Sequence, residues 1–460
     1  MPSRNLVQNS LENAPHGSGG SCWTRLWLLL PVGWGLWLVH AFGVNVVFND
    51  EWSLVPLFHG IAERSAGWTD LWPQSNEHRM FFPRLVLLAS ALLTDFNTKV
   101  QMYVSQLWIL LAYATHLEYL GSLPARKEPW RTGAGLLVGL ACYNTMQYEN
   151  FLWGFQMAFL MVLCFAVMGF YGLHRALQEN RFRWVGVALA AGVAASFSSL
   201  QGLLIWPAYV AVLLAAASTS GKSGLKWAAA VGACGLLVWA AYFAGYQKPD
   251  WSPDYLGRGA GYSAAYFFAS VGGFAAARHA ALALAMGGLA FALAAGLVVD
   301  LWRRRRLKEN AFALGLILFG YAVSGALAIG RSDQGDGIAG AMTSRYSTYS
   351  LLSYVGMLLI ALREQDRWRT TVSARSWRRR VCVGVLAVFS AIVLGKAVLY
   401  VQPCRKWRAE RKAEIEVLRN YPAATAEQLG RLKPFADAAT ARRHVERLER
   451  FRWNVFAESP

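Results

Sequence analysis

The chain has 460 residues, of which 45 are Lys or Arg and 27 are Asp or Glu, and its formal net charge is +18. In a soluble protein this excess of basic residues would indicate a nucleic-acid partner. However, hydrophobic residues make up 55% of the chain and charged residues only 16%, with a mean hydropathy of +0.29. This composition excludes a soluble globular enzyme, a disordered chain and a disulfide scaffold, and it predicts an all-α, polytopic transmembrane helical bundle.

Long apolar segments recur along the chain, and eleven of them are expected to cross ~30 Å of hydrocarbon as helices. In chain order, we expect these crossings near residues 23–48, 100–120, 132–147, 151–173, 184–200, 203–219, 226–246, 280–302, 310–330, 346–362 and 381–401. Two shorter apolar stretches, 81–94 and 263–277, are expected to be half-helices or helices on the membrane surface. The prediction is therefore a bundle of about 11–13 membrane helices.

The basic residues follow the positive-inside rule if the N-terminus is cytoplasmic. With that orientation, the inward-facing segments hold 22 Lys and Arg against six acidic residues, and the outward-facing loops hold six against ten. The alternative, in which 81–94 and 263–277 both cross fully, would put three of the basic loops outside. We therefore expect a multi-pass protein of a bacterial inner (cytoplasmic) membrane with a periplasmic C-terminus.

The two ends of the chain differ in composition from its membrane region. Residues 1–22 are polar and are expected to form a flexible cytoplasmic tail. Residues 23–401 are the expected transmembrane catalytic module, with 45–80 as its first periplasmic loop. Residues 402–460 carry 13 basic and eight acidic residues, with apolar positions at helical spacing. They are expected to form one or two amphipathic helices on the membrane surface or on the periplasmic loops.

The first outward loop carries two adjacent acids, Asp50 and Glu51, directly after the first crossing. Carboxylates at a membrane interface lose solvation and repel each other, so one of them should have a raised pKa and could act as a general base near neutral pH. Alternatively, the pair only caps a surface helix and marks the hydrophobic boundary. The same loop also contains Glu77, His78 and Arg79 before the next apolar stretch.

Four later outward loops contain the same kinds of residue. The turn after the third crossing is so tight that Glu149 and Gln156 must lie at or below the membrane surface, where an unpaired carboxylate is costly. The candidate residues of the other loops are Gln201, Lys248, Arg331, Arg345 and Tyr346. Acids, amides, cations and aromatic rings together suit carbohydrate and phosphate recognition, because rings stack on sugars and Arg pairs with phosphate oxygens.

This pattern resembles the GT-C superfamily of membrane glycosyltransferases, which includes protein O-mannosyltransferases and lipid A aminoarabinose transferases. The resemblance rests on the Asp50-Glu51 pair within a long first external loop and on Glu149 at the outer end of the third crossing. A mobile outer loop at 246–262 and a late outer Arg also fit. The resemblance covers most of residues 23–400. The chain departs from the family in being shorter than most members and in having Glu149 where Asp is commoner.

The resemblance implies a lipid-linked donor, a polyprenyl-phosphate sugar, used at the periplasmic face. The sugar would be transferred with inversion to a glycan, lipid or protein acceptor. Asp50 would accept the proton of the acceptor hydroxyl, and Glu51 would orient the acceptor or tune the base. Arg345, with Lys248 or Arg331, would neutralise the charge that develops on the departing phosphate.

The remaining acidic and imidazole side chains have a second expected role. Glu77, His78 and Glu149 would line the sugar pocket or hold a divalent cation, the one cofactor that the pattern leaves open. Besides the donor and the acceptor, membrane lipids are the expected partners, and nucleic acid is not expected.

A transporter or flippase for a lipid-linked glycan is the alternative function, and a non-catalytic assembly subunit is a third. Transporters show internal repeats and charged or broken helices at mid-membrane. Here no repeat is evident and the candidate charges gather on one face, which favours the enzyme.

Overall fold

The structure is a computed structural model that describes residues 25–123, 128–220, 223–249, 258–276, 279–333, 336–370, 377–432, 435 and 437–457. The tail predicted at 1–22 and the centre of the outer loop predicted at 246–262 lie outside these residues. Within them the chain is helical, and its only β-pairing is an isolated bridge between Ser75 and His78. The predicted all-α fold is confirmed.

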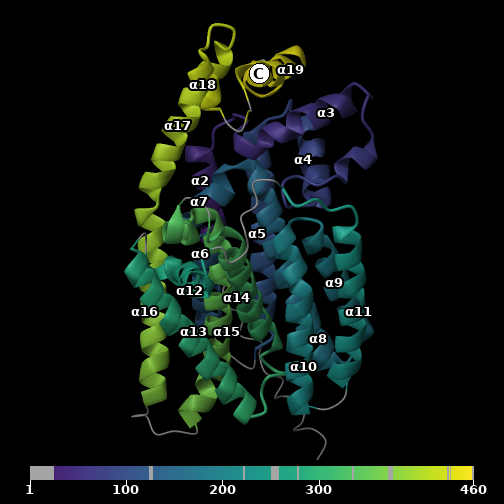
Figure 1. Cartoon of the computed structure of the whole chain (residues 1–460). Helices are drawn as coiled ribbons and strands as arrows, with labels where there is room; N and C mark the ends of the chain where they lie inside the picture. Colours follow the sequence, from purple (N-terminus) through teal and green to yellow (C-terminus); the bar gives the residue numbers. More distant parts are fainter. Residues whose placement is uncertain are drawn as a thin grey trace, which may run out of the picture.

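Each of the eleven predicted crossings overlaps a helix of the bundle (Figure 1). These helices are α2 (Leu30–Phe42), α5 (Thr98–Gly121), α6 (Glu128–Cys142), α8 (Met157–Glu179), α9 (Phe182–Ser196), α10 (Ile205–Ser220), α11 (Ser223–Phe243), α13 (Ala280–Arg303), α14 (Ala311–Arg331), α15 (Ser347–Thr370) and α16 (Trp377–Leu399). Six helical stretches of the described chain combine the length and the apolar composition that a membrane crossing requires.

The two shorter apolar stretches are helices α4 (Phe81–Leu93) and α12 (Ala260–Ala276). Met80 lines a cavity at one end of the bundle, and the carbonyl of Asp95 accepts a hydrogen bond from the backbone N–H of Asn454 at that same end. Helix α4 therefore begins and ends on one side of the bundle, as a half-helix does. The pairing of α12 with α13 is close, because the ideal Cβ of a residue at Gly272 would lie 1.9 Å from the carbonyl oxygen of Ala283.

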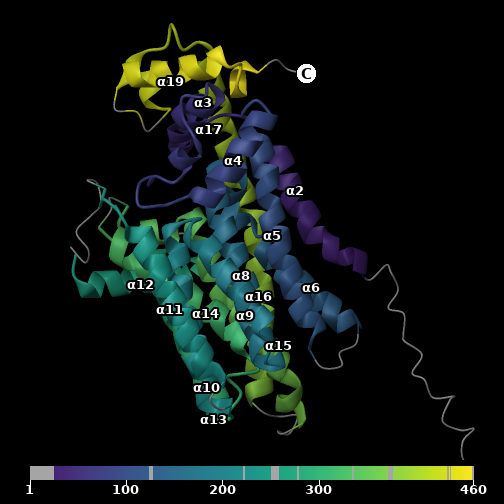
Figure 2. The same ribbon diagram turned by 90° about the vertical axis from the view of Figure 1, so that its right-hand side faces the viewer.

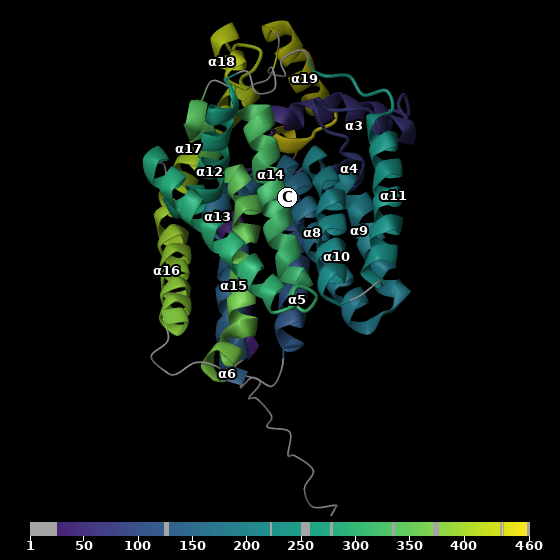
Figure 3. The same cartoon turned by 60° about the horizontal axis from the view of Figure 1, so that its bottom comes forward.

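Helix α8 is the centre of the bundle and is surrounded by its neighbours. In its most apolar stretch 89% of the residues are buried, against 22% in α13. Helices α16 and α11 lie at opposite edges of the bundle (Figures 1 and 3). Apolar faces toward lipid need no protein partner, so the outer helices keep exposed Leu and Val side chains.

One end of the bundle is covered by helices from the first loop and from the C-terminal segment. From the first loop come the short η2 (Asn49–Ser53) and α3 (Leu54–Ala62), and from the C-terminal segment come α17 (Val401–Arg419), α18 (Ala426–Gly430) and α19 (Ala438–Arg450) (Figures 1 and 2). Helix α19 lies against α3, where Phe451 meets His59 edge to face at 4.6 Å between ring centroids. The helices predicted at 402–460 therefore rest on the first loop.

We expect the α12–α13 contact to depend on glycine. In Gly287→Ala, the added Cβ would meet the carbonyl oxygen of Phe268 at 1.9 Å, which forces the two backbones apart. The expected cost is about 1–3 kcal/mol, seen as a lower melting temperature in detergent. Gly288→Ala is the matched control, because a Cβ there meets nothing within 4 Å. Equal melting temperatures for the two variants would contradict this packing.

Candidate active site

A cavity of about 370 Å³ opens at the covered end of the bundle, where four of the five outward loops meet. Eight of the twelve residues singled out from the sequence line it: Asp50, Glu77, His78, Gln156, Gln201, Arg331, Arg345 and Tyr346. They come from segments that are far apart in sequence, and the helix ends bring them together. The cavity is polar on one side and aromatic on the other.

Asp50 enters the cavity from the short helix η2, directly after the extended segment that follows α2. Its neighbour Asn49 has a φ of 49°, a left-handed conformation that Asn tolerates. Burial raises the pKa of Asp50 above its usual value, while the positive charges of Arg345 and Arg331 and a hydrogen bond from Asn76 act in the opposite direction. A carboxylate with a raised pKa between two cations is suited to take up a proton.

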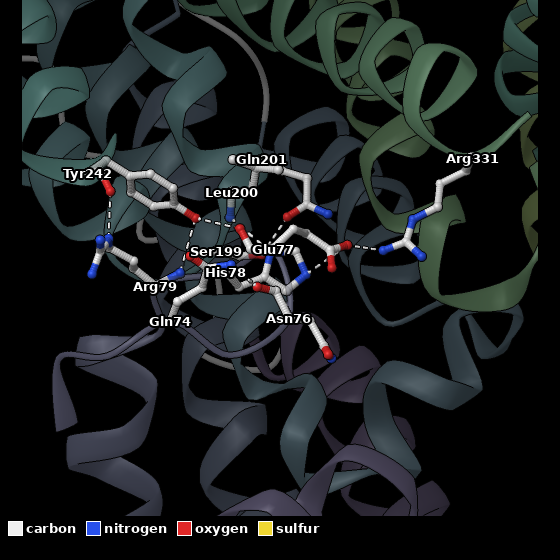
Figure 4. Close-up of polar contacts among 10 residues, drawn as sticks. All are labelled: Gln74, Asn76, Glu77, His78, Arg79, Ser199, Leu200, Gln201, Tyr242 and Arg331. Carbon is white, nitrogen blue, oxygen red and sulfur yellow. Dashed lines mark hydrogen bonds and ion pairs between the residues drawn. The ribbon is translucent and has the colours of Figure 1, made fainter. Parts of the chain in front are cut away.

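Glu77 and His78 form the polar wall of the cavity together with Arg331 (Figure 4). Arg331, at the end of α14, makes an ion pair with Glu77. The backbone N–H of Leu200 donates to Nδ1 of His78 at 3.3 Å, so the neutral ring carries its proton on Nε2, which lies 3.5 Å from Glu77. Burial lowers the pKa of His78 to about 4. At neutral pH His78 is therefore a hydrogen-bond donor toward Glu77 and not a cation.

Arg345 is held in place by Glu149, which lies behind it. The Glu149 carboxylate accepts a hydrogen bond from the backbone N–H of Arg345 at 3.2 Å and lies 3.6 Å from its guanidinium. Asn150 adds a hydrogen bond to the Arg345 carbonyl at 3.0 Å. The Arg345 guanidinium also lies over the ring of Tyr346, 5.1 Å from its centroid. Glu149 thus acts on the cavity through Arg345 and does not line it.

Glu51 points away from the cavity and is only 1% exposed. Its two carboxylate oxygens accept hydrogen bonds from the backbone N–H groups of Phe48 and Phe155, each at 2.9 Å. The expectation that Glu51 orients the acceptor therefore does not fit its position, because it joins two backbone segments behind the cavity wall. Its expected role in tuning Asp50 stays a prediction.

Two further candidates lie outside the cavity lining. Arg79 is buried, and its guanidinium donates to the backbone carbonyls of Tyr242 and Ala244, so that it ties the first loop to the end of α11 (Figure 4). Lys248 is exposed and does not line the cavity. The cations of the cavity wall are Arg331 and Arg345.

The cavity also contains residues that were not selected from the sequence. Trp153, Phe155 and Phe159 form the aromatic side, and the Nε1 of Trp153 and the Oε1 of Gln156 have no hydrogen-bond partner within the described part of the chain. Asn76, Ser199 and Asn49 add polar groups. In the sequence, each of these six residues lies within three residues of a selected one.

The side chains present do not form a metal site. Among the described residues, no group of three His, Cys, Asp or Glu side chains is close enough together to hold a metal ion. Glu77 is paired with Arg331, and Nδ1 of His78 accepts from a backbone N–H group, so neither keeps its full set of lone pairs for a cation.

A second cavity, of about 220 Å³, adjoins the first and shares Glu77, His78, Gln201 and Arg331 with it. Its other lining residues are apolar or aromatic and come from η6 (Leu200–Leu204), from α11 and the residues just after it, and from α14: Leu200, Leu203, Leu204, Trp239, Phe243, Tyr246, Ala326, Leu327 and Gly330. The Glu77–Arg331 ion pair therefore stands where a polar compartment meets an apolar one.

Comparisons with known proteins found similarity to a solved structure. No protein-family model matches the chain, and no curated protein matches it. The chain is similar to the crystal structure of ArnT from Cupriavidus metallidurans bound to undecaprenyl phosphate. The likeness covers 94% of this chain and 87% of that one, with a TM-score of 0.47 and 13% sequence identity.

The neutral His78 predicts a specific pH dependence of stability. Below pH 6.5 the unfolded chain takes up a proton on His78 that the folded chain refuses until about pH 4, so stability should fall as the pH decreases through this window. The full effect is about 3 kcal/mol. We expect the melting temperature of His78→Gln to decline less between pH 7 and pH 4.5 than that of the unaltered protein. His40→Gln, at an exposed position of α2, is the control and should change nothing.

Proposed function

We propose that the chain is a membrane glycosyltransferase of GT-C type, which transfers a sugar from a polyprenyl-phosphate donor to a glycan, lipid or protein acceptor. The observation that carries this proposal is the meeting of Asp50, Arg331 and Arg345 in one cavity. A buried carboxylate beside two arginines matches what the reaction needs, namely a proton acceptor and a stabiliser of developing negative charge.

In the proposed reaction, Asp50 removes the proton of the acceptor hydroxyl while its oxygen attacks the anomeric carbon. The bond between that carbon and the phosphate oxygen breaks, and the electron pair leaves with the polyprenyl phosphate. The attack comes from the face opposite to the leaving group, so the anomeric configuration inverts. The phosphate gains one negative charge in this step, and Arg331 and Arg345 lie where they can neutralise it.

The sugar of the donor would lie against the aromatic side of the cavity. Trp153 and Phe159 line the cavity with aromatic rings on which a sugar can pack, and the amides of Gln156 and Gln201 line it with groups that can bind sugar hydroxyls. Glu77 and His78 complete the polar side. A cavity of about 370 Å³ has the size of a pocket for one or two sugar units rather than for an extended glycan.

The prenyl chain would occupy the adjoining apolar cavity between η6, α11 and α14. Because Arg331 lines both cavities, a phosphate held there can have its sugar on one side and its hydrocarbon on the other. The undecaprenyl phosphate in the ArnT structure belongs to the chemical class of the carrier proposed here, but the proposal rests on the cavities. We place the reaction at the periplasmic face of a bacterial inner membrane, with the N-terminus in the cytoplasm.

Asp50→Asn tests the assignment of the base. We expect sugar transfer from a radiolabelled polyprenyl-phosphate sugar to fall by about 100-fold or more, because general-base catalysis contributes about 10²–10⁴-fold. Asp70→Asn is the control, since Asp70 is an exposed acid of the same loop. Full activity in Asp50→Asn would remove Asp50 as the base. A flippase would release no polyprenyl phosphate in this assay. Release of polyprenyl phosphate by the unaltered protein therefore distinguishes a transferase from a flippase.

Ala326→Trp tests the assignment of the prenyl site. Ala326 lines the apolar cavity, and an indole there should raise KM for a long-chain donor about tenfold, equivalent to about 1.4 kcal/mol of lost binding. KM for a donor with a single short prenyl unit should stay unchanged. Ile329→Trp, one turn further along α14 and outside the cavity lining, is the matched control. Equal effects on KM for long-chain and short-chain donors would mean that the prenyl chain binds elsewhere.

A further inference from the structure

The C-terminal segment reaches the stretch of chain that carries Asp50, although more than 350 residues separate them. Asn454 is 2% exposed and binds this stretch through its side chain. Its Oδ1 accepts a hydrogen bond from the backbone N–H of Val47 at 3.2 Å, and its Nδ2 donates to Oδ1 of Asn45 at 2.7 Å. The same Nδ2 donates to the carbonyl of Phe96 at 2.9 Å. One amide therefore ties residues 45–47 to the end of α4.

Arg411, on α17, contacts the next residue of the same stretch. Its guanidinium lies 3.7 Å from the ring centroid of Phe48 and 4.8 Å from that of Trp407. It makes an ion pair with Glu414 at 2.8 Å, and its Nε is buried without a hydrogen-bond partner in the described structure. A cation stacked this closely on Phe48 restricts the segment two residues before Asp50.

Glu51 connects this contact to the opposite wall of the cavity. Its carboxylate holds the N–H of Phe48 on one side and the N–H of Phe155, a cavity residue, on the other. Burial raises the pKa of Glu51 to about 8, and the two backbone hydrogen bonds and the positive charge of Arg411 offset this only in part. The link between Arg411 and the opposite wall is therefore one of contact: Arg411 stacks on Phe48, and Glu51 joins the N–H of Phe48 to that of Phe155.

We propose that Arg411 and Asn454 are positioning residues for Asp50, so that the C-terminal segment sets the geometry of the catalytic base without touching the substrate. This proposal rests on the proposed function in assigning Asp50 as the base. The contacts themselves, through Phe48, Glu51 and residues 45–47, are independent of it. Loss of either side chain should loosen the segment that carries Asp50 while the two substrate cavities keep their lining.

The test uses the full-length protein with three substitutions on α17. Arg411→Met keeps most of the length and the apolar contact but removes the charge, Arg411→Lys restores the charge, and Arg405→Met on the exposed face of the same helix is the control. We expect kcat of Arg411→Met to fall about 10- to 100-fold with KM for the lipid donor within twofold of normal. Arg411→Lys should recover most of the loss, and Arg405→Met should behave as the unaltered protein.

Hydrogen exchange gives a readout that needs no activity. In Arg411→Met, the amides of residues 45–51 and Phe155 should exchange at least tenfold faster, with no change in α13. Asn454→Gly is the second variant, because glycine tolerates the φ of 57° at this position and only the side chain is lost. It should accelerate exchange at residues 45–47 and also lower kcat.

Three results would overturn the proposal. These are normal kcat and normal exchange in Arg411→Met, equal losses in the Met and Lys variants, or a lower melting temperature with unchanged exchange at residues 45–51. The last two would make Arg411 a residue of general stability only. If the unaltered protein transfers no sugar, the proposed function fails, and the exchange measurements still decide whether the C-terminal segment restrains residues 45–51.

Discussion

The constraint on which the site depends is the cost of holding a carboxylate away from water at the edge of a hydrophobic bundle. An isolated buried charge is expensive, so a buried acid must be neutralised, hydrogen-bonded or paired. The acids around this cavity meet this requirement in different ways. Glu77 pairs with Arg331, Glu149 pairs with Arg345, and Glu51 accepts two backbone hydrogen bonds. Two of these acids line the cavity, Glu77 and Asp50, and whereas Glu77 is paired with Arg331, Asp50 has cations nearby and one amide donor.

The two arginines of the cavity have a property that follows from these pairs. Each is balanced by a carboxylate of the protein itself, so the site does not require a resident anion to be stable. A phosphate that enters between Arg331 and Arg345 competes with Glu77 and Glu149 for them. Binding then replaces the ion pairs with Glu77 and Glu149 by ion pairs with the phosphate. This replacement favours ligands that carry more negative charge. In the proposed reaction the phosphate gains charge, so these contacts strengthen as the reaction proceeds.

Much of this arrangement could be predicted from the sequence, because membrane helices have strong and simple signals. Apolar length located the helices, and the distribution of basic residues grouped the loops that meet at the cavity. The orientation of neighbouring side chains could not be predicted. Asp50 and Glu51 are adjacent and chemically alike, and only the short helix that contains them sends one into the cavity and the other behind it. Likewise, nothing in the sequence distinguishes Arg79, which binds backbone carbonyls, from Arg331, which faces the cavity.

The position of Asn454 has a consequence for the order in which the protein becomes complete. A chain is made from its N-terminus, and the helices that carry Asp50 and its arginines enter the membrane before the last residues leave the ribosome. The segment around Asn45 and Val47 is held by Thr98 and also by Asn454, which is among the last residues described. The contacts of this segment are therefore completed by a part of the chain that is made much later. A nascent or prematurely terminated product has the helices and the charges but lacks the side chain that ties residues 45–47 to the end of α4.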